Sequence, residues 1–78
     1  MILTIGDRVK RERDRLCMAQ HDLSMATGFT VTYISQVESG HIKSPGVVKL
    51  AKIAKALGVT PNDLLGIKAT AKADRAAI

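Results

Sequence analysis

A single glycine between two short helical patterns, Gly28, is the feature that most constrains the fold of this chain. The segment before it, residues 20–27, has the apolar spacing of a helix, and the segment after it places Ile34 and Val37 three residues apart on one face. The chain must turn sharply where the two patterns meet. Glycine adopts the positive φ of such a turn without a steric penalty from a Cβ atom. The sequence therefore predicts two helices joined by a tight turn.

The spacing across this stretch is typical of a helix-turn-helix motif. Counted from Gln20, a small residue stands fifth, the glycine ninth, and apolar residues fifteenth and eighteenth, which are Ser24, Gly28, Ile34 and Val37. A small side chain allows the two helices to cross closely, and the apolar pair anchors the second helix to the core. Thr30 precedes the second helix, and its hydroxyl can cap the helix start.

The outward side of the second helix would carry short side chains that suit DNA bases. Hydroxyl and amide groups can hydrogen-bond base edges in the major groove, and a small aliphatic group can contact the thymine methyl. The candidates for reading bases are Val31, Thr32, Ser35 and Gln36.

This stretch resembles the lambda-repressor-like helix-turn-helix domains, the Cro and phage-repressor or XRE type. The resemblance extends from about Ile5 to Leu65 and includes ESG at residues 38–40 and IAKALGV at residues 53–59. It implies an all-α fold of five helices. It also implies a sequence-specific regulator of transcription, most simply a repressor, that binds a palindromic DNA operator as a homodimer.

The resemblance further implies roles for single residues. Arg13 would pair with Glu38 and lock the first helix against the third, which is a structural role. The residues that would contact the DNA backbone or a base edge are Gln20, Thr30, Ser39, His41, Lys43 and Ser44. An ordinary surface glutamine remains an alternative for Gln20, and an ordinary polar loop remains one for the residues after position 40. Lys43 has the clearest electrostatic reason to contact a phosphate.

The dimer interface is expected near the end of the chain, mostly on the ground of the resemblance. The apolar residues that could form a self-complementary patch there are Val59, Leu64, Leu65 and Ile67. Residues 1–66 would form the DNA-binding domain. Residues 67–78 would form an alanine-rich tail that could extend as a weak helix, stay frayed, or add to the dimer.

Capping patterns and apolar stripes predict the remaining helices. Thr4 would cap a first helix over residues 5–16, Ser44 and Pro45 would start a fourth helix, and Thr60 would cap a short last one. The buried stripe of the fourth helix would consist of Val47, Leu50, Ile53, Ala54 and Leu57. Lys49, Lys52 and Lys55 would lie on its opposite side as a solvated face.

The composition bounds the class of protein and of partner. A chain of 78 residues allows one small domain, and 46% hydrophobic with 24% charged residues is typical of a globular protein. A net charge of +5 favours a polyanionic partner, although a basic surface kept for solubility has the same charge. Two aromatic residues are too few for the stacking surfaces of single-strand and RNA binders. The resemblance implies double-stranded DNA as the partner.

Several other classes are not expected. No spacing suggests a catalytic arrangement, a phosphate-binding glycine loop, a cofactor, an effector domain, a signal peptide or a membrane span, so a cytoplasmic protein that is not an enzyme is predicted. Cys17 and His21 are only two ligands and would make a poor zinc site. A protein-interaction module with the same helices, or an antitoxin-type partner, is the alternative function. Within the regulator class, a phage repressor, a restriction–modification controller and an antitoxin remain open.

Overall fold

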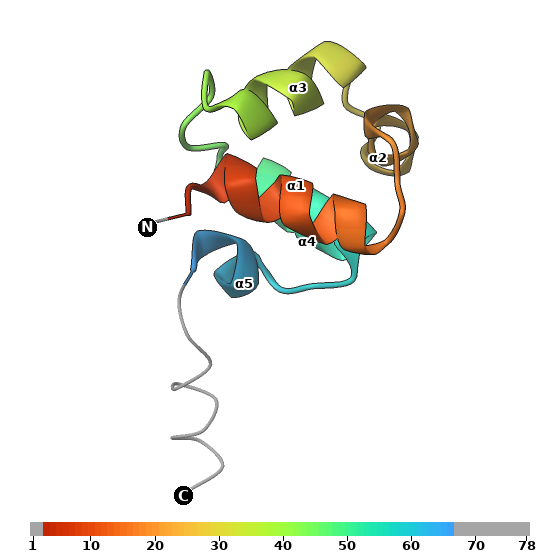
Figure 1. Ribbon diagram of the computed structural model, residues 1–78. Coiled ribbons are helices and arrows are strands. Elements are labelled where there is room, and N and C mark those ends of the chain that lie inside the picture. Colours follow the sequence, from red (N-terminus) through yellow and green to blue (C-terminus); the bar gives the residue numbers. More distant parts are fainter. Residues whose placement is uncertain (1–2, 67–78) are drawn as a thin grey trace, which may run out of the picture.

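The computed structural model describes residues 3–66, and these residues form an all-α fold of five helices. The helices are α1 (Ile5–Arg15), α2 (Gln20–Thr27), α3 (Val31–Ser39), α4 (Val47–Leu57) and α5 (Pro61–Leu65). Figure 1 shows α3 at the outer edge of the fold, with α1 across the middle, α4 behind it and α5 below. The predicted fold class is confirmed.

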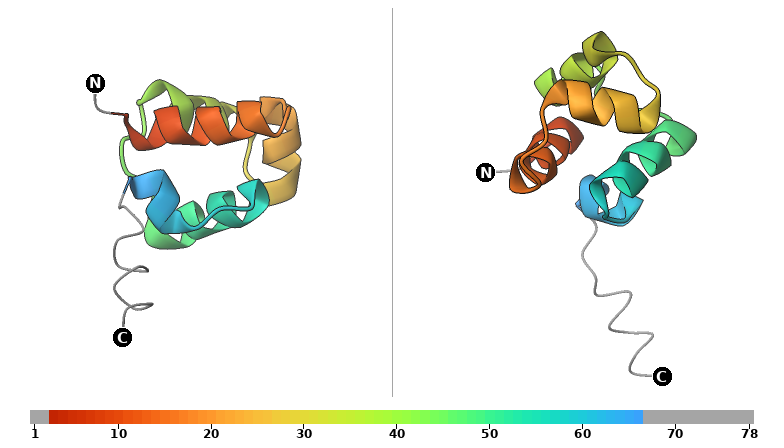
Figure 2. Two further views of the ribbon diagram at one scale, coloured as in Figure 1. Left: turned by 60° about the horizontal axis from the view of Figure 1, so that its bottom comes forward. Right: turned by 90° about the vertical axis from the view of Figure 1, so that its right-hand side faces the viewer.

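The apolar faces of the five helices meet in one core. In the right-hand view of Figure 2, α1 and α4 lie on opposite sides, and α2 and α3 span the space above them. The residues buried in this core are Val9, Leu23, Ile34, Val37, Leu50, Ile53, Ala54, Leu57 and Leu64. The core thus fixes α2 and α3 from below and leaves the outer side of α3 free.

The turn between α2 and α3 has the predicted geometry. Gly28 has a φ of +82°, in the left-handed region, and its N–H donates to the Ser24 carbonyl over 2.8 Å. The Thr30 hydroxyl accepts a hydrogen bond from the Tyr33 N–H over 3.0 Å and so caps α3. The Ser24 hydroxyl donates to the Phe29 carbonyl, which closes the turn from inside. A helix-turn-helix unit is therefore present at residues 20–39.

Side chains cap α1, α3 and α5 where the sequence predicts them. The Thr4 hydroxyl accepts from the Asp7 N–H, and the Asp7 carboxylate accepts from the Thr4 N–H, each over 3.0 Å. Thr60 caps α5 through the same kind of exchange. Ala19 cannot supply the capping oxygen for α2, but its N–H donates to the Asp22 carboxylate over 2.9 Å. Half of a capping box is therefore kept there.

The start of α4 differs from the prediction. Gly46 is the N-cap, and its carbonyl accepts the hydrogen bond from the Leu50 N–H over 2.8 Å, so Ser44 and Pro45 lie before the helix. Val47, which was expected in the buried stripe, is 84% exposed. It stands in the first turn of α4, where the core does not cover it. α1 also ends one residue earlier than predicted, at residue 15.

α1 crosses the end of α3 at Gly6, a position that the sequence patterns did not single out. A Cβ atom at Gly6 would lie 2.1 Å from the Val37 carbonyl oxygen and 2.8 Å from the Glu38 carbonyl oxygen. Both are backbone atoms, so only a separation of the two helices could relieve the overlap. The missing side chain at Gly6 thus sets how closely α1 approaches α3.

Replacing Gly6 by alanine should lower the free energy of unfolding by about 1–3 kcal/mol through overpacking. The loss should appear although alanine favours a helix over glycine by about 1 kcal/mol. Urea unfolding of the wild type and the variant measures the net change in the free energy of unfolding. Gly46→Ser is the control, because nothing lies within 4 Å of a Cβ atom at Gly46 and serine is a good N-cap. A Gly6→Ala protein as stable as the wild type would contradict the close approach.

Candidate nucleic-acid interface

α3 presents one side to the core and the other to solvent. Ile34 and Val37 are fully or almost fully buried, whereas the four predicted base-reading residues, Val31, Thr32, Ser35 and Gln36, are exposed. No other helix of residues 3–66 covers this side of α3 (Figures 1 and 2). The structure therefore brings the four side chains together on one open surface.

The loop after α3 is folded against the end of that helix. The Ile42 N–H donates to the Gln36 carbonyl over 3.1 Å, and the Ser39 hydroxyl donates to the same carbonyl over 3.2 Å. Gly40 ends α3 in the left-handed conformation, with a φ of +90°. The predicted backbone-contact residues in and beside this loop, Ser39, His41, Lys43 and Ser44, are all exposed, as is Thr30 at the other end of α3. This loop places a cation next to the open surface of α3.

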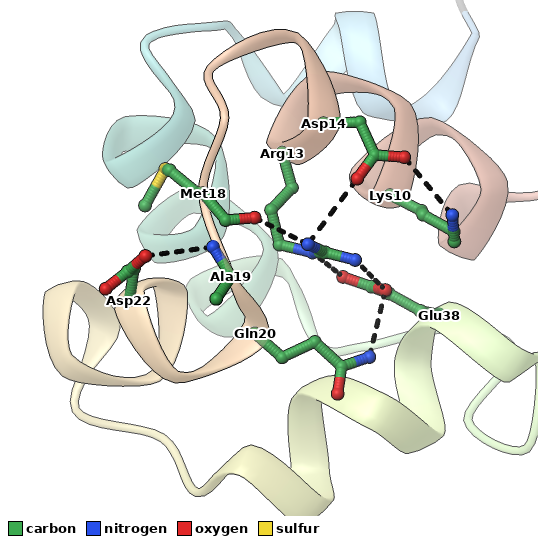
Figure 3. Close-up of polar contacts among 8 residues, drawn as sticks. All are labelled: Lys10, Arg13, Asp14, Met18, Ala19, Gln20, Asp22 and Glu38. Carbon is green, nitrogen blue, oxygen red and sulfur yellow. Dashed lines mark hydrogen bonds and ion pairs between the residues drawn. The ribbon is translucent and has the colours of Figure 1, made fainter.

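A buried ion pair joins α1 to the end of α3 (Figure 3). Arg13 Nε donates to Glu38 Oε2 over 2.7 Å, and Arg13 Nη2 donates to Glu38 Oε1 over 3.0 Å. Arg13 Nη1 donates to the Met18 carbonyl over 2.6 Å, in the link to α2. The two side chains are only 10% and 4% exposed. The predicted pair is thus present, and it joins three segments of the chain.

The hydrogen bonds to Glu38 raise the pKa of Arg13, while burial acts in the opposite direction. The guanidinium therefore keeps its charge at any pH at which the protein folds. A bidentate pair between a guanidinium and a carboxylate also fixes the mutual angle of the two groups. The pair accordingly sets the orientation of α3 as well as its distance from α1.

Gln20 takes part in the same network. Its Nε2 donates to Glu38 Oε1 over 3.1 Å, and its amide oxygen points away from the pair (Figure 3). Sequence reasoning placed Gln20 against DNA and did not foresee this contact. The contact with DNA stays a prediction, and orientation of the Glu38 carboxylate is an additional role that the structure shows.

Aromatic and cationic groups occupy the opposite flank of α3. The rings of Phe29 and Tyr33 meet edge to face with centroids 5.1 Å apart. The ammonium groups of Lys49 and Lys52 lie 5.2 Å and 6.0 Å from the centroids of Tyr33 and Phe29, respectively. These contacts hold α4 against the start of α3. The Tyr33 hydroxyl is buried and has no hydrogen-bond partner among residues 3–66, and this burial raises the pKa of Tyr33.

The predicted dimer patch does not form one surface. Leu64 is wholly buried in the core, so its assignment to an interface is wrong: α5 turns this side chain inward. Val59 is half-buried against the same core, and Leu65 is 45% exposed. Ile67 lies outside the described residues. Among the described members of this predicted patch, Leu65 and part of Val59 have surface to offer a partner.

The described residues contain neither a metal cluster nor a membrane-spanning helix. Within residues 3–66, no group of three or more His, Cys, Asp or Glu side chains is placed to hold a metal ion. Over that same part of the chain, every helix is too short or too polar to cross a membrane. The open surface of α3 and its two flanks therefore remain the candidate site.

Known helix-turn-helix proteins resemble this chain in sequence and in structure. A helix-turn-helix family model matches residues 9–64, from within α1 to within α5. The control protein C.BamHI of Bacillus amyloliquefaciens is 38% identical over 64 residues, which cover 81% of this chain and 78% of that protein. Among solved structures, the P22 c2 repressor protein in complex with a synthetic operator has a TM-score of 0.78 at 28% identity, covering 86% of this chain and 100% of that one. The restriction-modification controller protein C.AhdI from Aeromonas hydrophila has a TM-score of 0.73 at 28% identity, covering 78% of this chain and 91% of that one.

A variant that lacks one member of the buried ion pair should be much less stable than the wild type. Arg13→Ala leaves the Glu38 carboxylate buried without its cation, so the free energy of unfolding should fall by about 3–5 kcal/mol. The double variant Arg13→Met with Glu38→Leu removes both charges and should recover most of the loss. Urea unfolding of the three proteins measures this.

The control for the ion pair is the exposed pair on α1. Arg15 Nε lies 2.7 Å from Glu12 Oε1, but the Arg15 side chain is 57% exposed, so Arg15→Ala should change stability by about 0–1 kcal/mol. A double variant as unstable as Arg13→Ala alone would contradict the account, because the loss would then not come from an unpaired buried charge.

The Tyr33 hydroxyl should add nothing to stability. A buried polar group without a partner is unfavourable by about 1–3 kcal/mol, so Tyr33→Phe should leave the free energy of unfolding unchanged or raise it. Because burial raises the pKa of Tyr33 above its ordinary value of 10.0, the wild type should lose stability as the pH rises past that value. Tyr33→Phe should lose less over the same range. Urea unfolding at neutral and alkaline pH measures both effects, and a clear loss at neutral pH would show that the hydroxyl has a partner.

Proposed function

Because the chain belongs to the lambda-repressor-like (XRE-type) helix-turn-helix family, a family of DNA-binding regulators of transcription, we propose that it represses transcription by binding a palindromic operator through α3 as a homodimer. The observation that carries this proposal is the open outer side of α3, which gathers four short side chains able to contact base edges. The family is not an enzyme family, and the proposed activity is binding alone.

In the proposed complex α3 lies in the major groove. Gln36 would pair with an adenine through both atoms of its amide, and Val31 would pack on a thymine methyl. Thr32 and Ser35 would donate to or accept from neighbouring base edges. These contacts would supply the sequence preference.

Backbone contacts would set the register on the duplex without reading the sequence. Their proposed sources are Gln20, Thr30, Ser39, His41, Lys43 and Ser44. Lys43 would contribute most to attraction, because it carries the positive charge in this set at neutral pH. The amide oxygen of Gln20 is directed away from Glu38, so this residue could contact DNA and keep its bond to the carboxylate.

The small size of the base-reading surface on α3 favours a dimer. One α3 offers only a few base contacts, and two copies would read half-sites about 34 Å apart, one turn of the duplex. Leu65 and Val59 support an interface near α5 because they keep some exposed apolar surface. Residues 1–66 would form the DNA-binding domain, and residues 67–78, including Ile67, would be a tail that adds to the dimer.

The relatives favour two of the three regulatory roles. C.BamHI is a control protein, C.AhdI is a restriction-modification controller, and P22 c2 is a repressor seen with an operator. These resemblances support a controller or a phage-type repressor over an antitoxin. An inverted repeat upstream of its own gene and a neighbouring restriction–modification pair would support the controller role. We assign the protein to the cytoplasm, where a regulator of this kind meets its DNA.

Substitutions on α3 and in the following loop should have different effects on binding. The preferred site is first selected from random duplexes. Gln36→Ala or Thr32→Ala should then lose about 1–3 kcal/mol of discrimination at particular base pairs. Lys43→Ala should weaken all duplexes alike and make the salt dependence shallower by about one unit of slope.

Fluorescence anisotropy with the selected site and its single-base variants measures these effects. Exposed Met25, on α2 and outside the proposed contacts, supplies the control Met25→Ala, which should bind like the wild type. If Gln36→Ala kept the full preference at every position, the base-reading role of α3 would be wrong. If the wild type showed no salt-dependent duplex binding, the proposed function itself would be wrong.

A further inference from the structure

Three lysines form a row along α4, on the side that faces the turn between α2 and α3. Lys49, Lys52 and Lys55 follow one another at intervals of three residues, and all three are exposed. We call this row the lysine ridge. The first two lie over the Tyr33 and Phe29 rings, so the ridge is ordered against the helix-turn-helix unit and is not a set of independent surface charges.

The lysine ridge differs from the cationic surface of α1 in that none of its three lysines forms an ion pair within residues 3–66. On α1, Lys10 Nζ lies 3.2 Å from Asp14 Oδ2 and Arg15 Nε lies 2.7 Å from Glu12 Oε1, so that charge is largely balanced. α4 contains no acidic residue at all. The positive charge of the ridge is therefore concentrated and exposed to a partner.

The nearest helices do not balance this charge either. α2 and α3 contain one acidic residue each. Asp22 accepts from the backbone at the start of α2, and Glu38 is buried with Arg13. Asp22 stands one helical turn before Ala26, and neither carboxylate pairs with a ridge lysine within residues 3–66.

The position of the ridge relates it to the DNA-reading surface. Tyr33 and Glu38 lie on opposite flanks of α3, since one contacts α4 and the other contacts α1. Figure 2 shows the same arrangement, with α1 and α4 on opposite sides below α2 and α3. Lys49 therefore borders α3 on the flank away from Gln20. A duplex seated on α3 has a sugar–phosphate backbone along both edges of its groove.

An open hollow lies at the far end of the ridge. It has a volume of about 450 Å³ and is lined by Ala26, Thr27, Lys52, Lys55 and Ala56. Small side chains form most of its lining, and two ammonium groups belong to it. A phosphate group could thus approach both lysines without moving a large side chain.

We propose that the lysine ridge binds phosphates of the same duplex whose bases α3 reads. This inference rests on the proposed function and extends it, because it adds a second set of backbone contacts on the flank of α3 opposite Gln20. The contacts are with phosphate and carry no sequence information. The position of Lys49 beside the reading surface of α3 favours DNA over an acidic protein as the partner.

The test uses a random-sequence duplex several helical turns long, so that no operator need be known. The ridge variant is Lys49→Gln, Lys52→Gln and Lys55→Gln together, and binding is followed by fluorescence anisotropy over a series of salt concentrations. Each phosphate contact releases counterions from the DNA when the protein binds, and this release sets the salt dependence. Loss of the three contacts should therefore make the slope of log affinity against log salt shallower by about one per lysine. Sequence preference among duplexes should stay that of the wild type.

Two matched variants distinguish an effect of the ridge from an effect of the net charge of the protein. Lys10→Gln, Arg11→Gln and Arg15→Gln together remove the same three charges from α1, and this protein should keep nearly the wild-type slope. Lys49→Arg, Lys52→Arg and Lys55→Arg together keep the charge and should also keep the slope. Thermal unfolding of each variant verifies that the fold is intact. If the triple glutamine variant unfolds, the single variant Lys55→Gln, which leaves both lysine–ring contacts in place, replaces it and should make the slope shallower by about one.

The outcomes are distinct. A ridge variant with the slope and affinity of the wild type would overturn the inference, and so would equal losses in the ridge and α1 variants, which would show an effect of net charge alone. Loss of slope in the arginine variant would also overturn it. If the wild type bound no duplex, the proposed function would fail first and the inference with it.

Discussion

The orientation of α3 depends on the bidentate pair between Arg13 and Glu38. α1 contacts α3 at two places. Gly6 lies against the backbone at Val37 and Glu38, and Arg13, two turns later along α1, pairs with the Glu38 side chain. Two contacts spaced along one helix fix an angle, whereas a single contact would fix only a distance. The Met18 carbonyl and the Gln20 amide tie the start of α2 to the same pair. One network thus positions both helices of the helix-turn-helix unit.

A buried pair of charges is not the simplest way to hold two helices together. Apolar side chains of similar size often stabilise a site as well or better, because they avoid the desolvation of both charges. Apolar contacts are not directional, however, while a guanidinium and a carboxylate meet in one plane and at one angle. A helix that presents side chains to base edges must hold its angle closely, so the directional contact suits the proposed function. Stability and positioning are therefore supplied by different contacts, the first by the apolar core and the second by this pair.

Sequence reasoning succeeded where the cause is local and failed where it is tertiary. Gly28, Thr30 and Thr4 were predicted correctly because turn and cap preferences act within a few residues. The Arg13–Glu38 pair was foreseen through the resemblance, since no local pattern links residues so far apart in the chain. Leu64 and Leu65 are adjacent apolar residues, and only the packing of α5 on the core decides which one turns inward.

The start of α4 and the close approach at Gly6 had no such local signal. Ser44 and Pro45 have the composition of a helix start, but the helix begins only after Gly46, whose carbonyl accepts the first helical hydrogen bond. At Gly6 the requirement comes from the carbonyl groups of another helix, so a glycine inside a helical pattern was its only trace in the sequence. A pair of residues typical of a helix start can thus mislead, while an unexplained glycine within a helix indicates a close contact with another element.

In the proposed complex, the residues that attract DNA are different from the residues that recognise its sequence. α3 contains no lysine or arginine, so its outward surface offers only hydroxyl, amide and small aliphatic groups. The cations stand on either side of it: Lys43 follows its end, and Lys49 borders its start over the Tyr33 ring. Charges at the edges can attract any duplex with little regard to sequence, because phosphates are the same everywhere. A neutral reading surface between them must then rely on hydrogen bonds and shape, which discriminate between base pairs. A wrong sequence would keep the attraction but lose the contacts of α3, so the difference between operator and other DNA would arise almost entirely from this one helix.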